Sequence, residues 1–232
     1  MLHRTIRRAR RELELWIILA SLTTLPFWFS DLDLRLAALF YRPDRIGDVW
    51  PYQHWGLWEV LYDYAFPFTV WSGIVALAVY VAGHFHAYTR RFRLRALYIL
   101  LVIALGPGLV VNLIVKDHWG RARPVHVTQF GGEHQYTPPL QFGHTPDKSF
   151  VCGHCAVGYT FFVLYFLSQS HKLLYFGLTL ALAWTMGLTR MTSGGHFVSD
   201  ILWSGYLVFL VAYLLYYGWY VRATKLHLRS KH

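Results

Sequence analysis

Six stretches of the chain contain no Asp, Glu, Lys or Arg and are apolar on all sides. They cover residues 15–30, 64–83, 96–115, 149–171, 173–189 and 201–221. A helix needs roughly 20 residues to cross a hydrocarbon core about 30 Å thick. Helices of a soluble bundle would instead be amphipathic, with a charged outer face. The pattern therefore predicts an all-α polytopic membrane protein with six transmembrane helices in one bundle.

The connections between these stretches contain no Ser/Gly linker, charge block or internal repeat, so residues 1–232 are predicted to form a single domain. After the first span, Leu32, Leu36 and Phe40 share one helical face, which predicts a short helix lying in the membrane interface. The connection from Lys116 to Lys148 is the longest one and is rich in Gly, Pro, His and Gln. Long connections of this kind are usually functional, and we expect it to border a site.

Charge sets the expected orientation. Charged residues make up 15% of the chain, against roughly 25% in soluble domains, and the net charge is +10 from 22 Lys+Arg and 12 Asp+Glu. Fourteen of the basic residues fall on the side of the two termini and eight on the other side. By the positive-inside rule, both termini are expected in the cytoplasm. The basic excess thus reflects topology, and no nucleic-acid partner is expected.

The first polar cluster follows the third apolar stretch, in the run KDHWGRARP. It contains Lys116, Arg121 and Arg123. A lysine supplies a mobile point charge, and an arginine supplies a planar fork that grips two phosphate oxygens. The group suits a phosphate dianion, although basic residues at helix ends also commonly anchor a protein to lipid headgroups.

The second cluster opens the fourth stretch, in the run SFVCGHCAVG. Ser149 is the expected N-cap of this helix, Gly153 allows close approach of the backbone, and His154 falls in the first turns. A helix N-terminus presents free amides and a positive dipole end, so it binds anions readily. His154 is expected beside an anion bound there, although a lone histidine near an interface is also compatible with a structural role.

The third cluster joins the last two stretches, in the run RMTSGGHFVSD. His196 and Asp200 are four residues apart, so on a continuous helix they would share a face. A carboxylate in that position can hold the imidazole by one ring nitrogen and raise the basicity of the other. A purely structural ion pair is the alternative, but Arg190 adds a further cation to this group and favours the functional interpretation.

Together the three clusters fit the motifs K-x6-R-P, the end of P-S-G-H, and S-R-x5-H-x3-D. This signature, from residue 116 to residue 200, resembles that of the type 2 phosphatidic acid phosphatase superfamily. The resemblance implies a membrane phosphatase with six spans and its site at the outer face. Val151 and Cys152 stand where the family has Pro and Ser, and Thr189 replaces a Ser.

The family's roles carry over to the matching positions. By resemblance, His196 is the nucleophile that forms a phosphohistidine, Asp200 orients it, and His154 is the general acid for the leaving alkoxide. The positions expected to bind the phosphate are Lys116, Arg123, Arg190, Cys152 and Gly153. No metal and no cofactor are expected, because positioning and charge neutralisation dominate phosphoryl transfer.

Two other classes of protein remain as alternatives. Cys152 and Cys155 enclose a C-G-H-C motif, typical of a thiol-disulfide oxidoreductase, although no strand pattern of a thioredoxin-like unit accompanies it. Whether the two cysteines form a disulfide is open. A transporter would carry charges along a path through the membrane, whereas here they cluster at one face.

The expected substrate is a lipid phosphate of the bilayer. The style of the motifs resembles that of bacterial lipid A phosphatases, which favours lipid A at the periplasmic face of the inner membrane. Undecaprenyl diphosphate, phosphatidylglycerol phosphate and phosphatidic acid are the alternatives. The position of the phosphate on lipid A and the oligomeric state are open.

Overall fold

A computed structural model describes residues 2–229, and this part of the chain is helical, with one isolated bridge between Val127 and His134 in place of any strand. The α-helices are α1 (Leu2–Phe29), α2 (Leu32–Ala38), α3 (Gly56–Phe85), α4 (Ala87–Arg90), α5 (Arg93–Ile103), α6 (Gly153–Tyr159), α7 (Phe162–Leu167), α8 (Lys172–Thr192), α9 (Val198–Leu215) and α10 (Val221–Arg229). Two π-helical segments, η2 (Ala104–Lys116) and η5 (Tyr216–Tyr220), continue α5 and α9. Short 3-10 turns complete the chain: η1 (Pro51–His54), η3 (Pro124–His126) and η4 (Thr128–Phe130).

Five helical segments are long and apolar enough to cross a membrane: Thr5–Phe29, Gly56–Phe85, Arg93–Lys116, Lys172–Thr192 and Val198–Lys225. They correspond to five of the six predicted stretches and confirm the all-α membrane fold. The first, second and last helices extend well beyond the uncharged stretches, because charged residues at their ends continue the helix. The expected interfacial helix is also present, as α2.

The fourth predicted span differs from the expectation. Residues 149–152 are not helical, and the helix that follows is short and interrupted, as α6 and α7. The backbone amides of Ser149 and Cys152 donate to Arg121 O (3.1 Å) and Asp200 O (3.2 Å). Two of the first four residues of the stretch therefore donate to partners elsewhere in the chain, and the helix begins only at Gly153.

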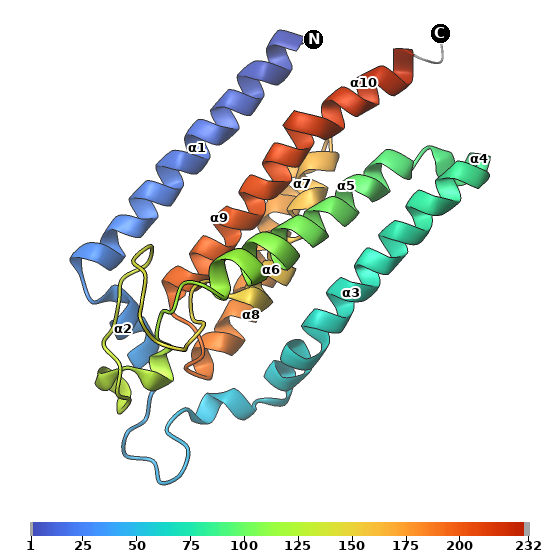
Figure 1. The fold of residues 1–232 in the computed structure, drawn as a ribbon. Coiled ribbons are helices and arrows are strands. Elements are labelled where there is room, and N and C mark those ends of the chain that lie inside the picture. The colour runs from blue at the N-terminus through green and yellow to red at the C-terminus, as the bar shows by residue number, and fades with distance from the viewer. Residues whose placement is uncertain (1, 230–232) are drawn as a thin grey trace.

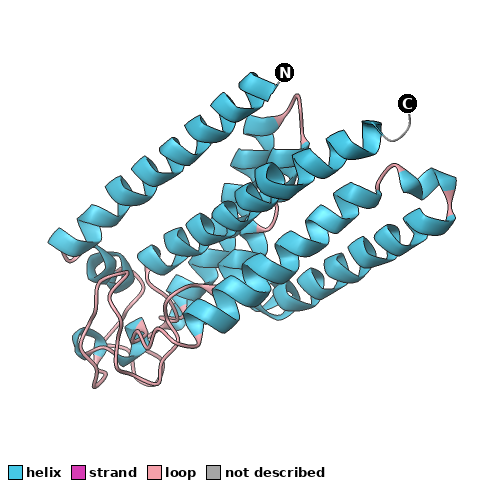
Figure 2. Cartoon of the chain, turned by 45° about the horizontal axis from the view of Figure 1, so that its top comes forward, coloured by secondary structure: helices cyan, strands magenta, loops and turns pink. Residues whose placement is uncertain are grey.

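The helices lie roughly side by side, with α1 at one flank of the bundle, α3 at the other, and α5 and α9 between them (Figure 1). The start of α1 and the end of α10 lie at one end of the bundle. The opposite end carries α2 and the long loops, which Figure 2 shows gathered together. The chain thus concentrates its irregular structure at the end away from the termini.

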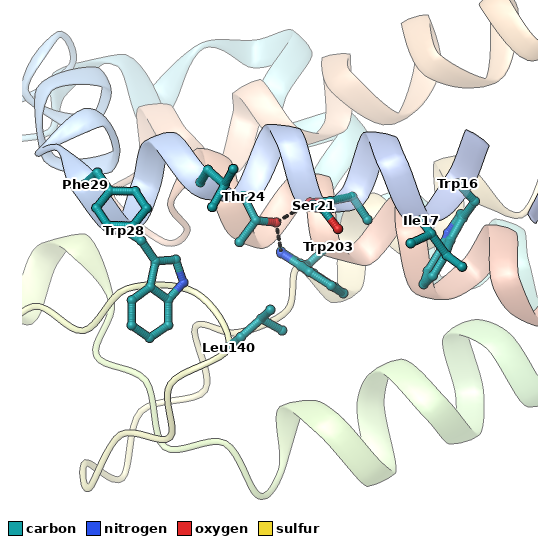
Figure 3. Close-up of a pocket in the computed structure, with 10 residues that line it drawn as sticks. Trp16, Ile17, Ser21, Thr24, Trp28, Phe29, Leu140 and Trp203 are labelled. Atoms are coloured by element: carbon teal, nitrogen blue, oxygen red, sulfur yellow. Dashed lines mark hydrogen bonds between the residues drawn. The ribbon is translucent and has the colours of Figure 1, made fainter. Parts of the chain in front are cut away.

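Helix α1 is fastened to α9 by two indole hydrogen bonds. Trp203 Nε1 donates to Thr24 Oγ1 (3.1 Å), as Figure 3 shows, and Trp16 Nε1 donates to Tyr206 O (3.0 Å). Leu140, from the long loop, lies over the same region and closes a pocket of about 420 Å³ beside α1. No charged residue lines this pocket, so it is not where a phosphate would bind.

Candidate active site

The three clusters predicted from the sequence converge at the loop end of the bundle. Lys116 ends η2, His154 is the second residue of α6, Arg190 lies in the last turn of α8, and His196 lies in the turn before α9. Backbone hydrogen bonds tie these segments together. One joins the loop after Arg123 to the α8–α9 turn, and another joins the start of α6 to α9.

Two glycines bring cationic side chains close to the backbone. A Cβ atom at Gly153 would lie 3.2 Å from Lys116 Nζ and 2.7 Å from Asn112 Oδ1, so only glycine leaves room for both groups at the start of α6. A Cβ at Gly195 would collide with the Arg190 guanidinium. The ammonium group and the guanidinium therefore pack directly on the two turns that carry His154 and His196.

Tyr62 of α3 joins this group, although no motif in the sequence marks it. Its ring stacks on the His154 imidazole, with centroids 4.4 Å apart and planes inclined by 14°. On the same ring, Arg190 Cζ lies 4.8 Å from the centroid. Tyr62 thus fixes the imidazole plane and holds the guanidinium beside it through a cation–π contact.

His196 and Asp200 face each other, with Nδ1 3.5 Å from Oδ2, and both side chains are buried. The expectation that one continuous helix carries them was wrong. His196 precedes Phe197, the N-cap of α9, and Asp200 accepts a hydrogen bond from the Phe197 amide at 2.9 Å. The carboxylate reaches back over the helix start, in the manner of a capping box, and meets the imidazole there.

Burial lowers the pKa of His196 to about 4. The Asp200 carboxylate opposes this shift, and the charges of Arg190 and Lys116 add to it. The imidazole is therefore neutral at pH 7. With Nδ1 turned toward the carboxylate, we assign the proton to Nδ1, which leaves a lone pair on Nε2.

Asp200 has two further partners, and one of them corrects a sequence prediction. Ser149, expected as an N-cap, instead donates its hydroxyl proton to Asp200 Oδ2 at 2.7 Å. The N-cap of α6 is Cys152, whose Sγ accepts from the Cys155 amide at 3.2 Å. The other partner is Arg121 Nη1, which donates to Asp200 Oδ1.

Arg121 is fully buried and links two carboxylates. Its Nη2 donates to Asp33 Oδ2 at 2.9 Å, while Nη1 serves Asp200 and also Ser199 Oγ (2.8 Å). The Nε atom donates to Thr137 O at 2.9 Å. Burial acts to lower the pKa of Arg121, but the two carboxylates outweigh it and the pKa is raised. The guanidinium is thus a permanent cation between Asp33 and Asp200.

No motif in the sequence marks Asp33, and Arg121 was expected among the phosphate-binding cations. Asp33 is completely buried and also accepts from the Ser199 amide (3.0 Å) and from Tyr136 OH (3.2 Å). A carboxylate near the apolar face of a membrane helix is costly unless it is paired. The free-energy cost of leaving such a carboxylate unpaired is the feature from which a role for Asp33 could have been predicted.

Arg123 and Arg190 each bury an Nε atom that has no hydrogen-bond partner within residues 2–229. The Arg123 amide donates to Asp147 Oδ2 at 2.9 Å, which fixes the backbone of this residue. Buried N–H groups are nearly always paired, so two orphaned guanidinium donors indicate a place for an anion. The described residues contain no group of three or more His, Cys, Asp or Glu suited to hold a metal.

Cys152 and Cys155 form a disulfide with Cα atoms 5.4 Å apart, and both are completely buried. Cys152 therefore has no S–H group, and its amide already donates to Asp200 O. The prediction that Cys152 binds the phosphate is not supported by this geometry. A redox partner could not reach the buried sulfur atoms either, which argues against the oxidoreductase alternative.

The fold and site define an integral membrane protein with a cationic, histidine-containing site at one end of its bundle. The profile of the PAP2 superfamily matches residues 95–223, more than half of the chain. The chain belongs to the PAP2 superfamily, as its motifs indicated. None of the solved structures matches it at a significant level.

Several relatives share this family resemblance. A lipid A 4′-phosphatase of Francisella tularensis subsp. novicida is 33% identical over 193 residues, which cover 81% of this chain and 86% of the relative. A lipid A 4′-phosphatase of Rhizobium etli is 33% identical over 120 residues, covering 48% of this chain and 46% of the relative. A lipid A 1-phosphatase of Rhizobium etli is 31% identical over 145 residues, covering 60% and 56%.

Proposed function

We propose that this protein is a lipid phosphatase that removes the 4′-phosphate from lipid A. The observation that carries the phosphatase assignment is the grouping of a neutral, buried His196 with Asp200, His154 and two arginines whose buried donors are unpaired. Lipid A is favoured because a relative that aligns over 81% of this chain and 86% of its own length is a lipid A 4′-phosphatase.

The proposed reaction passes through a phosphohistidine. His196 Nε2 attacks the phosphorus atom, and the bond to the lipid oxygen breaks as that oxygen takes a proton from His154. Asp200 stabilises the charge that develops on the His196 ring. Water then attacks the phosphorus and gives a proton to His154, while the P–N bond to His196 breaks and inorganic phosphate leaves. This restores the neutral His196 imidazole and the protonated His154.

The phosphate oxygens are held by the cations around this centre. Lys116, Arg123 and Arg190 neutralise the charge that spreads over the equatorial oxygens in the transition state. The amides at the start of α6, from Gly153 onward, add donors and a helix dipole. We propose that no metal takes part. A strict requirement for a divalent cation, restored after treatment with a chelator, would contradict this part of the mechanism.

The test is phosphate release from lipid A by the purified protein in detergent. His196→Ala is expected to abolish turnover, and His154→Ala to lower it by about 10²- to 10⁴-fold. His118→Ala is a matched control, because His118 is exposed at the same end of the bundle. Near-normal turnover in either site variant would refute the corresponding role. Trapping of acid-labile phosphate on the wild-type chain, and none on His196→Ala, would identify the intermediate.

We also propose that the protein lies in the bacterial inner membrane, with both termini in the cytoplasm and the site facing the periplasm. The basic residues at the end of the bundle that carries the termini support this orientation. Reporter fusions at the C-terminus and at the exposed Arg45 would test it. A C-terminal fusion active only in the periplasm would contradict the proposal.

A further inference from the structure

A second, polar pocket lies beside the phosphate-binding residues. It has a volume of about 470 Å³ and is formed by turn η1, the first two turns of α3 and the end of α8. The side chains that matter for its chemistry are Gln53, Trp58, Glu59, Tyr62, Asp63 and Arg190. Of these, only Arg190 and Tyr62 belong to the active site described above, so the other groups have no assigned role.

This pocket continues from the phosphate site. Arg190 belongs to both, and the Tyr62 ring contacts both its guanidinium (4.8 Å) and the His154 ring (4.4 Å). A substrate whose phosphate is held by Arg190 would therefore place the neighbouring part of its headgroup in the pocket. The pocket is therefore positioned to bind and recognise the group that carries the phosphate.

The unpaired polar atoms of the pocket point to a ligand with hydrogen-bonding groups. Trp58 is nine-tenths buried, yet its Nε1 has no hydrogen-bond partner within the described residues. Asp63 forms no hydrogen bond or ion pair within residues 2–229, although it lies in the second turn of a membrane-spanning helix. A buried indole donor without a partner is expected to serve a function, and the exposed Asp63 carboxylate is free to accept hydrogen bonds from a ligand.

The combination of groups fits a sugar ring. Aromatic faces pack on the apolar C–H faces of a pyranose, while carboxylates and an amide accept and donate hydrogen bonds to its hydroxyl or acylamino groups. Glu59 and Asp63 are four residues apart on α3, so they share one face of the helix. The two carboxylates would also repel a second phosphate attached directly to the first.

We propose that this pocket is a subsite for the sugar that bears the phosphate, and that its carboxylates select a glycolipid monophosphate over a lipid diphosphate. This inference rests on the proposed function, because it assumes that phosphate binds at Arg190. It extends that function by assigning the headgroup specificity to residues outside the family signature.

The experiment compares two substrates in detergent micelles with the full-length protein. For each variant, kcat/KM is measured on lipid A and on phosphatidic acid, which lacks a sugar. Trp58→Phe keeps the ring and removes the N–H donor, and Asp63→Asn removes the charge. Each is expected to lower the ratio of the two kcat/KM values about tenfold, mainly through KM on lipid A, as the loss of one hydrogen bond to a ligand predicts.

Matched controls separate this effect from a general loss. Trp55→Phe changes an exposed tryptophan next to Trp58 that does not line the pocket, and should leave the ratio unchanged. Asp63 is exposed, so Asp63→Asn keeps the test valid if Trp58→Phe fails to fold. On undecaprenyl diphosphate, Asp63→Asn should gain activity severalfold.

The outcomes distinguish the two proposals. An unchanged ratio in both variants, or equal losses on both lipids, would overturn the sugar subsite while leaving the phosphatase in place. A wild-type protein that releases phosphate from phosphatidic acid but not from lipid A would also overturn the subsite. A wild-type protein that releases phosphate from no lipid would overturn the proposed function itself, and the subsite with it.

Discussion

The buried arginine between two carboxylates offers the sharpest test of how the site is organised. Arg121→Lys keeps the positive charge but removes the planar fork. A lysine has one ammonium group, which cannot serve Asp33 and Asp200 from opposite sides as the two guanidinium nitrogens do. Asp200 would lose its fixed position, and the orientation of His196 would follow.

The expected size of the effect comes from the lost contact. A hydrogen bond to a charged group contributes about 1.5–3 kcal/mol. If about 2 kcal/mol of transition-state stabilisation is lost, kcat falls about thirtyfold. KM should change little, because Arg121 is completely buried behind Asp200 and does not line the pocket beside the phosphate site.

The assay is a double-mutant cycle in kcat with Asp200→Asn. If Arg121 acts through Asp200, the thirtyfold loss should shrink to less than about threefold when Asp200 is already asparagine. Arg45→Lys, an exposed arginine in the loop before α3, is the control, and unfolding temperatures show that each variant is folded. Equal losses in both backgrounds would refute the positioning role and leave Arg121 as a structural residue.

Three further predictions follow from the geometry. Gly153→Ala should lower kcat/KM at least tenfold in the phosphate-release assay, because the added Cβ would lie 3.2 Å from the Lys116 ammonium and displace it. A fully active variant would show that the ammonium can move without cost. Replacing Cys152 and Cys155 together by serine should cost about 2 kcal/mol of stability, because the disulfide closes only a short loop. The unfolding temperature should therefore fall while phosphatase activity persists. Loss of activity in a folded variant would argue that the disulfide is needed in the reaction. Burial lowers the pKa of His196 from 6.5 to about 4. Between these two pH values, His196 is protonated in the unfolded chain but neutral in the folded chain. Stability should therefore fall by up to about 3 kcal/mol as the pH drops from 6.5 to 4, and an equally steep decline in a folded His196→Asn variant would disprove this origin.

Much of the fold follows directly from the apolar runs, since a helix that is apolar on all sides is stable only where it is surrounded by lipid or by other apolar helices. The fourth span shows the limit of this reasoning. Its composition matches that of the other spans, but Ser149 and Cys152 give their amides to distant partners, and the helix starts late. Hydropathy does not record such long-range hydrogen bonds.

The members of the site could be predicted where their residue types form a motif of fixed spacing. The supporting residues could not. Tyr62 is one of 16 tyrosines in the chain and reaches His154 only through the packing of α3. Asp33 precedes Arg121 by 88 residues, so no local pattern pairs them. The contact of His196 with Asp200 was foreseen, but for a helical reason that the structure does not bear out.

The position of Asp33 has a consequence for what counts as a minimal enzyme. The family profile starts at residue 95, and all the motif residues lie after that point. Nevertheless, the carboxylate that completes the pairing of the buried guanidinium comes from the first 40 residues, before α3. A fragment of residues 95–223 would keep every residue of the signature. It would lack Asp33, however, so the buried Arg121 would be paired with Asp200 alone. The segment that identifies the family is therefore shorter than the segment that a complete active site needs.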